Sequence, residues 1–198
     1  MPTLIIAHTL QPPHLTTDLW DLGHELFRST QTTFPVPFLE GDILDPSFLP
    51  PVPPLPTSTT PLSPHAPLLS TVKSLSELQG HISAIFTGAF FHLFKYDGQA
   101  RVARLLASLL SPLPGSMLLG VQGGRHEKGF WCPAPGTQMN CHSPESWREL
   151  WEGVFAEVGA QVRVEARVRK EIGGDSLFGT YPDNTDPYHL LEWSVTRL

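Results

Sequence analysis

Two kinds of apolar segment alternate along the first 160 positions of the chain. Short apolar runs, four to six residues long, predict buried strands at 4–7, 82–86 and 116–121. Longer stretches that repeat apolar residues every three or four positions predict amphipathic helices at 19–28, 97–110 and 143–158. Two weaker signals predict a short strand that begins at 38–39 and a short helix or turn at 71–78.

After Gly159 the apolar period changes from 3.6 to 2 residues. Four apolar residues then alternate with charged ones: Val162, Val164, Ala166 and Val168. This alternation predicts a half-exposed strand, and 190–198 predicts a final strand. The connection at 173–187 favours an antiparallel hairpin, whereas the Gly- and Pro-rich residues 122–140 predict a long loop.

Strands that alternate with helices in this order predict an α/β fold. We expect one Rossmann-like, mostly parallel sheet that closes with the antiparallel hairpin. The length of 198 residues suits a single domain with a sizeable core.

Residues 46–68 interrupt the alternation. Nine of the 22 residues from 46 to 67 are proline, which removes amide donors and favours extended polyproline conformations. We expect a surface insertion in the domain that is partly disordered. A ligand for an SH3-type domain is the alternative for PPVPPLP, but no neighbouring Arg or Lys would orient it, so a plain loop insertion is favoured.

Composition excludes several classes of function. A net charge of −6 without any basic run argues against nucleic-acid binding. No apolar stretch reaches the roughly 18 residues that span a bilayer, and the N-terminus lacks signal-peptide features, so we expect a cytoplasmic protein without a membrane partner. The nine histidines lack the tight spacings of metal ligands, and we expect no metal site, with Cys132, Cys141 and His142 the one weak candidate.

Candidate chemistry lies in ISAIFTGAFFHLFKYDGQ, residues 82–99. The predicted strand there opens into small residues, Thr87 to Ala89, and then into aromatic residues around His92. Open α/β sheets bind ligands beyond the carboxyl ends of their strands, so this segment is suited to hold one. Ordinary core packing around one hydrogen-bonded histidine is the alternative.

Six segments in register resemble class I S-adenosylmethionine-dependent methyltransferases, in particular a fungal group found with meroterpenoid and polyketide pathways. The segments are DLWDLGHELFRS, FLEGDILDPSF, FTGAFFHLFKYDGQARVARLLASLL, PGSMLLGVQGG, SWRELWEGVFAEVG and LLEWSVTRL. The resemblance implies S-adenosyl-L-methionine as cofactor. It also implies methyl transfer to a small, hydrophobic metabolite of fungal secondary metabolism.

The resemblance also implies roles for individual residues. Asp42 would accept a hydrogen bond from the adenine amino group, and Ile43 would pack near the ring. Small residues at the end of a family strand let the cofactor approach the backbone, and they match Thr87, Gly88 and Ala89. Phe90 would begin the lining between sulfonium and acceptor, and His92 is the candidate base. A plain turn aspartate and a structural histidine are the alternatives.

The chain departs from the family pattern at its start. The family's first strand and glycine-rich turn have no counterpart, so the sheet would lack its first strand and helix. Either the remaining strands pair directly or the missing part comes from elsewhere, and a homodimer stays open. The alternative function is a truncated or degenerate methyltransferase-like protein that binds or interacts without catalysis.

Overall fold

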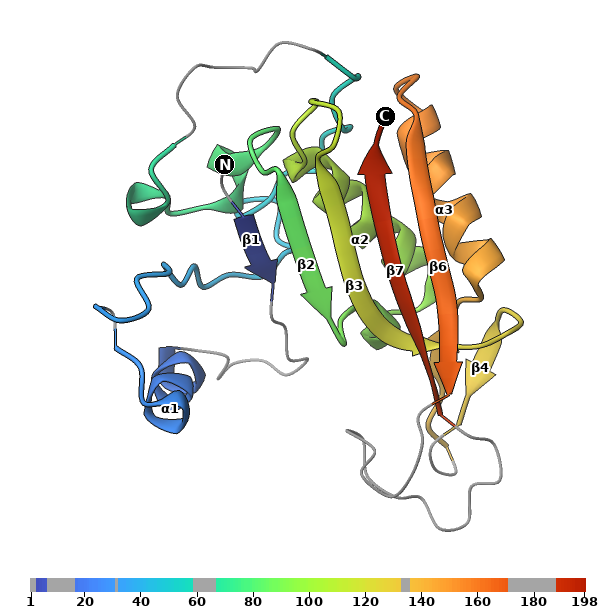
Figure 1. Cartoon of the computed structure of the whole chain (residues 1–198), viewed down its shortest axis with the longest axis horizontal. Coiled ribbons are helices and arrows are strands. Elements are labelled where there is room, and N and C mark those ends of the chain that lie inside the picture. Colours follow the sequence, from blue (N-terminus) through green and yellow to red (C-terminus); the bar gives the residue numbers. More distant parts are fainter. Residues whose placement is uncertain (1–2, 7–16, 31, 59–66, 133–135, 171–187) are drawn as a thin grey trace.

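The computed structural model describes residues 3–6, 17–30, 32–58, 67–132, 136–170 and 188–198. Its main sheet has five strands in the order β1-β2-β3-β7-β6 (Figure 1). The strands are β1 (Thr3–Ile6), β2 (Ala84–Gly88), β3 (Met117–Gly124), β6 (Val162–Lys170) and β7 (His189–Arg197). The α/β class with a mixed sheet, predicted from the sequence, is confirmed.

The first three strands of the sheet run parallel. Strand β1 pairs with β2, and β2 pairs with β3. These are the three segments that the apolar runs predict, each displaced by three residues or fewer. Because β1 bonds directly to β2, no gap is left between them.

The last two strands form the predicted antiparallel hairpin. Strand β7 pairs with both β3 and β6. The apolar residues of β6 pack toward the core and the alternating charged residues point away from it, as the period of two predicts.

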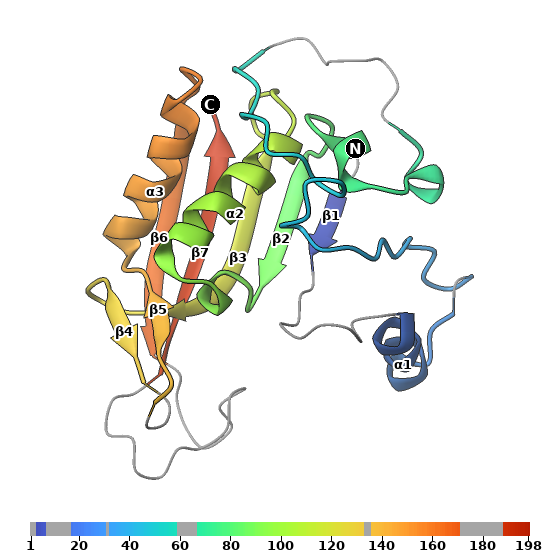
Figure 2. The ribbon, with the colours of Figure 1, turned by 180° about the vertical axis from the view of Figure 1, so that it is seen from behind.

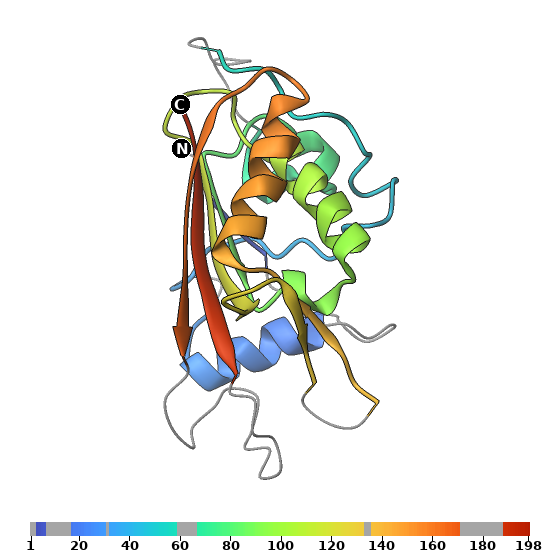
Figure 3. The same cartoon turned by 90° about the vertical axis from the view of Figure 1, so that its right-hand side faces the viewer.

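Two long helices cover one face of the sheet, α2 (Tyr96–Leu109) and α3 (Pro144–Ala156), as Figures 2 and 3 show. Their apolar sides join the inner residues of β2, β3 and β7 in one core. Aromatic rings fill its centre, where the ring of Phe91 lies edge-on to Trp147, at 4.8 Å, and to Trp193, at 5.8 Å. This core fixes the carboxyl ends of β2 and β3.

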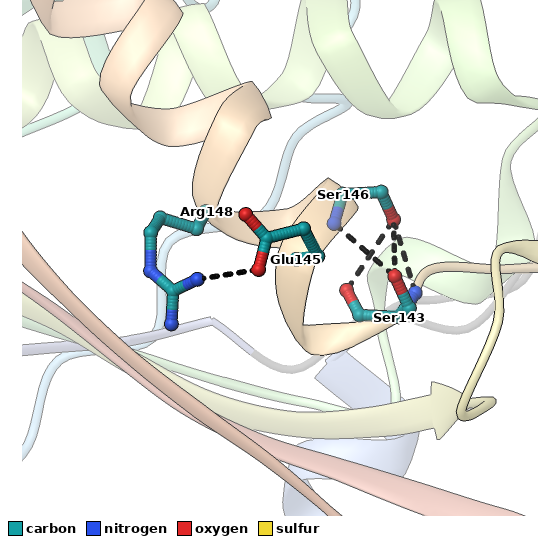
Figure 4. Close-up of polar contacts among 4 residues, drawn as sticks. All are labelled: Ser143, Glu145, Ser146 and Arg148. Atoms are coloured by element: carbon teal, nitrogen blue, oxygen red, sulfur yellow. Dashed lines mark hydrogen bonds and ion pairs between the residues drawn. The ribbon is translucent and has the colours of Figure 1, made fainter.

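Helix α3 begins with a reciprocal cap. The Ser143 hydroxyl accepts from the amide of Ser146 at 3.2 Å, and the Ser146 hydroxyl accepts from the amide of Ser143 at 3.0 Å (Figure 4). Arg148 adds an ion pair to Glu145 at 2.8 Å. In this Ser-x-x-Ser sequence the second serine takes the part that Glu usually plays in a capping box.

Two sequence expectations for local structure are wrong. Residues 38–39 form no strand, because prolines at 35 and 37 remove amide donors and no strand lies beside them. The expected loop at 122–140 instead continues β3 to Gly124. It then forms a small hairpin of β4 (Gly129–Trp131) and β5 (Met139–Cys141).

The proline segment contacts the core at a few points in its described part, where most of its other residues are exposed. Leu49 and Pro54 are buried. Proline-rich backbone has few donors but keeps its carbonyls, and side chains elsewhere donate to them: Gln79 to the carbonyl of Pro50 at 3.0 Å, and Arg197 to that of Leu55. Residues 59–66 lie outside the described part.

The remaining elements are short or peripheral. Helix α1 (Thr17–Phe27) confirms the predicted N-terminal helix. The weak signal at 71–78 corresponds to two 3-10 turns, η1 (Leu69–Thr71) and η2 (Leu75–Leu78), with Ser74 capping the second. A third, η3 (Phe91–Leu93), follows β2.

Candidate functional site

The carboxyl ends of the parallel strands β2 and β3 bring several predicted site residues together. Thr87 and Gly88 end β2, and Ala89 and Phe90 follow directly. Thr87 is buried, whereas Gly88 is partly accessible. A side chain at Gly88 would touch only the ring of Phe86, at 3.3 Å, so the backbone there is open to close approach.

Ala89 turns the chain sharply at this edge. Its φ of +50° is left-handed, a conformation that L residues other than Gly, Asn and Asp rarely adopt. Its amide donates to the carbonyl of Val121 in β3 at 2.7 Å. The strained turn therefore ties the start of η3 to the neighbouring strand, as residues at ligand sites often do.

His92 links η3 to the end of β3. Its Nδ1 accepts from the amide of Gly123 at 3.1 Å, so the neutral ring carries its proton on Nε2. Burial lowers the pKa of His92 to about 4, and the ring is therefore neutral at pH 7. In this tautomer Nδ1 is already occupied, and the role of base stays a prediction.

The aromatic residues after β2 divide between the core and its margin. Phe90 and Phe91 are fully buried, and their rings lie 5.8 Å apart, edge to face. Leu93 and Phe94 are half-buried. A bound molecule at this edge would therefore meet Leu93 and Phe94 before the two buried rings.

Asp42 and Ile43 lie in a separate turn. The Asp42 carboxylate accepts from the amide of Leu44 at 2.8 Å, as a plain turn aspartate does, and its side chain is exposed. Ile43 is buried in the core. Arg101 of α2 donates to the carbonyl of Leu44 at 2.9 Å and holds the turn against the helix that follows η3.

The β4–β5 hairpin is fastened beside η3. The Tyr96 hydroxyl donates to the carbonyl of Gly129 at 2.6 Å and lies 3.1 Å from that of Cys141. Gln99 donates from Nε2 to the carbonyls of Phe94 and Asn140, both at 3.0 Å. These bonds fix one wall of the site against the start of α2.

His142 adds a second buried imidazole to this wall. Its Nδ1 lies 2.8 Å from the hydroxyl of Ser146. Burial, assisted by the positive charge of Lys128, lowers the pKa of His142 to about 4. The ring packs against Tyr96, at 5.2 Å between centroids, so it supports the start of α2 and α3.

The buried polar atoms near the strand ends include two that lack a hydrogen-bond partner. Among the described residues, the hydroxyl of Thr87 and the amide nitrogen of Gln122 are buried without a hydrogen-bond partner. An unpaired buried polar group costs free energy, and the indole nitrogens of Trp147 and Trp151 in the core are unpaired in the same way. Residues 7–16, which follow β1 in the sequence, contain no glycine for a close turn.

The described residues hold no cluster of three or more metal-ligating side chains. Cys132 is exposed, whereas Cys141 is buried. Nor does the described part contain a helix with the length and apolar character needed to cross a bilayer.

Sequence patterns missed several residues of this site. Gly123 is the partner of His92, and a side chain there would collide with Met139 and Tyr188 at 2.7 and 2.8 Å. The adjacent glycines at the end of β3 were a usable signal, since paired glycines at a strand end often mark close approach of other elements. The bonds of Tyr96 and Gln99 carried no such signal.

Comparisons with known proteins point to fungal methyltransferases. O-methyltransferase phiE of a fungal species (strain ATCC 74256) is 32% identical over 148 residues, which are 74% of this chain and 41% of that protein. O-methyltransferase atr3 of Stereocaulon alpinum is 30% identical over 159 residues, which are 79% of this chain and 38% of that protein. The chain thus spans about two fifths of the length of these relatives.

Other comparisons add little. The Asnovolin E/Chermesin D methyltransferase nvfJ of Aspergillus novofumigatus is 30% identical over 92 residues, 46% of this chain and 33% of that protein. No family model matches. An S-adenosylmethionine-dependent methyltransferase from Mesorhizobium loti overlaps 60% of this chain and 63% of its own, at 14% identity and a TM-score of 0.33, which is too low to bear on function.

Proposed function

Since the chain is related to the class I S-adenosylmethionine-dependent methyltransferases of fungi, we propose that it acts in methyl transfer from S-adenosyl-L-methionine to a small, hydrophobic metabolite. The similarity over 74% of the chain carries the proposal. The strand edge at 87–90, with its open backbone and left-handed turn, supports it independently. The names of two relatives favour an oxygen as the atom methylated.

The proposal assigns the cofactor to the edge of β2. The open backbone at Gly88 and Ala89 would let the cofactor lie close, with the Thr87 hydroxyl within the same edge. The turn at Asp42 and Ile43 would hold the adenine. S-adenosyl-L-methionine supplies the methyl group as part of a sulfonium, and the chain's residues bind and align it.

For His92 we propose a positioning role. Its bond to Gly123 holds η3 against β3 and thereby shapes the path between Phe90 and Phe94. Methyl transfer depends on alignment of nucleophile, methyl carbon and sulfur more than on a strong base. If His92 were the base instead, its replacement by Asn would abolish turnover, although Asn keeps an acceptor near the position of Nδ1.

Calorimetric titration with S-adenosylhomocysteine tests binding. We expect the chain to bind S-adenosylhomocysteine. Gly88→Ala should bind it about tenfold more weakly or worse, because the added methyl group occupies the open backbone surface. Gly153→Ala is the matched control, since a side chain there meets nothing within 4 Å, and it should bind normally. Equal affinities of the two variants would contradict the assigned site.

The non-catalytic alternative gives a different result. A degenerate relative acting as a binding module would fold and show no heat of binding for the cofactor product. Absence of binding by the chain, with a cooperative unfolding transition retained, would replace the enzyme proposal with this one. Cytoplasmic location and the single-domain arrangement with its proline insertion stay predictions.

A further inference from the structure

One buried side chain joins two walls of the candidate site. Gln99 lies in the first turn of α2 and is fully buried. Its Nε2 donates to the carbonyl of Phe94, at the end of η3, and to the carbonyl of Asn140 in β5, both at 3.0 Å. The amide nitrogen has two hydrogens, and these two carbonyls use both of them. Gln99 therefore fixes the end of η3 relative to the β4–β5 hairpin.

The same segments meet again at Gly123, near the end of β3. His92 of η3 accepts from the amide of Gly123 at 3.1 Å. Met139 of β5 packs against this glycine, since a Cβ there would lie 2.7 Å from the methionine sulfur. Contacts thus run from β3 to η3, from η3 through Gln99 to β5, and from β5 back to β3. In such a network each contact limits the freedom of the others.

Tyr96 holds the hairpin from its other strand. Its hydroxyl donates to the carbonyl of Gly129 in β4 at 2.6 Å. Burial raises the pKa of Tyr96, so the hydroxyl keeps the proton that it donates. Beside it, Phe130 is 48% exposed, and its ring centre lies 6.0 Å from that of Tyr96. Figure 2 shows this hairpin at the end of the sheet where β2 and β3 finish.

We propose that Gln99 and Tyr96 are positioning residues for the methyl transfer proposed above, an inference that rests on that function. Gln99 has no exposed surface, so it acts through the segments that it holds and not by touching a bound molecule. Transfer requires the nucleophile, the methyl carbon and the sulfur to be aligned, and small displacements of the groups that hold them slow it. Because η3 follows the edge at 87–90 directly, a ligand at that edge should change the surroundings of Asn140 through Gln99.

Amide chemical shifts during titration with S-adenosylhomocysteine test the role. In the unmodified chain the amides of Ala89 and Asn140 should shift together, at the same ligand concentration. Gln99→Met has nearly the same length and no donor, so the Ala89 amide should still shift, with Kd within about threefold, while the Asn140 response is lost. Tyr96→Phe removes only a hydroxyl and should weaken the Asn140 response as well, which keeps the test available if Gln99→Met does not fold.

Arg104→Met is the matched control, because Arg104 also lies on α2 but pairs with Glu157, at 2.6 Å. Its responses at Ala89 and Asn140 should equal those of the unmodified chain. Two results would overturn the inference and leave the proposed function standing: a shift at Ala89 without one at Asn140 in the unmodified chain, or Asn140 responses in the folded variants equal to that of Arg104→Met. The absence of a shift at both amides in the unmodified chain would overturn both proposals.

Discussion

At the scale of single residues, two buried imidazoles make stability depend on pH. Burial lowers the pKa of His92 and of His142 from 6.5 to about 4. Unfolded rings take up protons below pH 6.5, whereas the folded rings do so only near pH 4. The free energy of unfolding therefore keeps its full value above pH 6.5. It falls as the pH drops from 6.5 to 4, by about 3 kcal/mol for each ring.

Urea unfolding of the chain and of His92→Asn at pH 7 and pH 5 measures this effect. Asn keeps an acceptor for the amide of Gly123 and does not titrate, so the variant should lose markedly less stability at pH 5 than the unmodified chain. Equal losses would mean that the His92 ring is not held neutral.

Gly120 is a residue that the sheet cannot replace. A side chain there would collide with the carbonyl and hydroxyl of Thr87 and with Trp193. Gly120→Ala should therefore destabilise the fold by about 2 kcal/mol or more, through overpacking. Gly153→Ala, within α3 and without neighbours, should stabilise it by about 0.5–1 kcal/mol. Thermal unfolding compares the two, and similar shifts in Tm would contradict the packing around Gly120.

At the scale of elements, caps and anchors decide where segments begin and stay. The Ser143 hydroxyl holds the first turn of α3, so Ser143→Ala should cost about 1 kcal/mol of unfolding free energy. Ser143→Asp keeps an acceptor at the cap and should recover most of that loss. Chemical denaturation distinguishes the two variants. If both were as stable as the unmodified chain, the cap would not contribute to stability.

The buried cation Arg197 anchors the proline segment near Leu55. Arg197 donates to the carbonyl of Leu55, and its guanidinium lies 5.1 Å from the ring centre of Phe155. In Arg197→Met the amide of Ser58, which bonds to Pro112, should exchange with solvent about tenfold faster. The amide of residue 197, bonded to Ser116 within the sheet, is the internal control. Unchanged exchange at Ser58 would locate the anchor elsewhere.

Elements differ in how far sequence alone predicts them. Long periodic segments such as α2 and β6 are predicted because burial of one face imposes their period. The β4–β5 hairpin is not predicted, because strands of three residues depend on a partner more than on their own pattern. The coil at 38–39 is not predicted either, because its short apolar pattern has no partner strand among the described residues. The proline segment packs through donors of Gln79 and Arg197, which lie far away in the sequence.

At the scale of the whole molecule, the sheet remains continuous through direct pairing of β1 with β2. Sequence reasoning located the edge at 87–90 because small residues follow an apolar run. It could not supply the bond from Gly123 to His92 or the left-handed turn at Ala89, since both involve contacts that the residues after β2 make with β3. Cofactor binding at that edge remains the central claim.

Mapping of amide chemical shifts during titration with S-adenosylhomocysteine tests that claim most directly. The account predicts the largest changes at the amides of Gly88, Ala89 and Gly123, with little change at 160–162, at the opposite end of the sheet. Saturating ligand that leaves these three amides unmoved, or that moves 160–162 most, would contradict it.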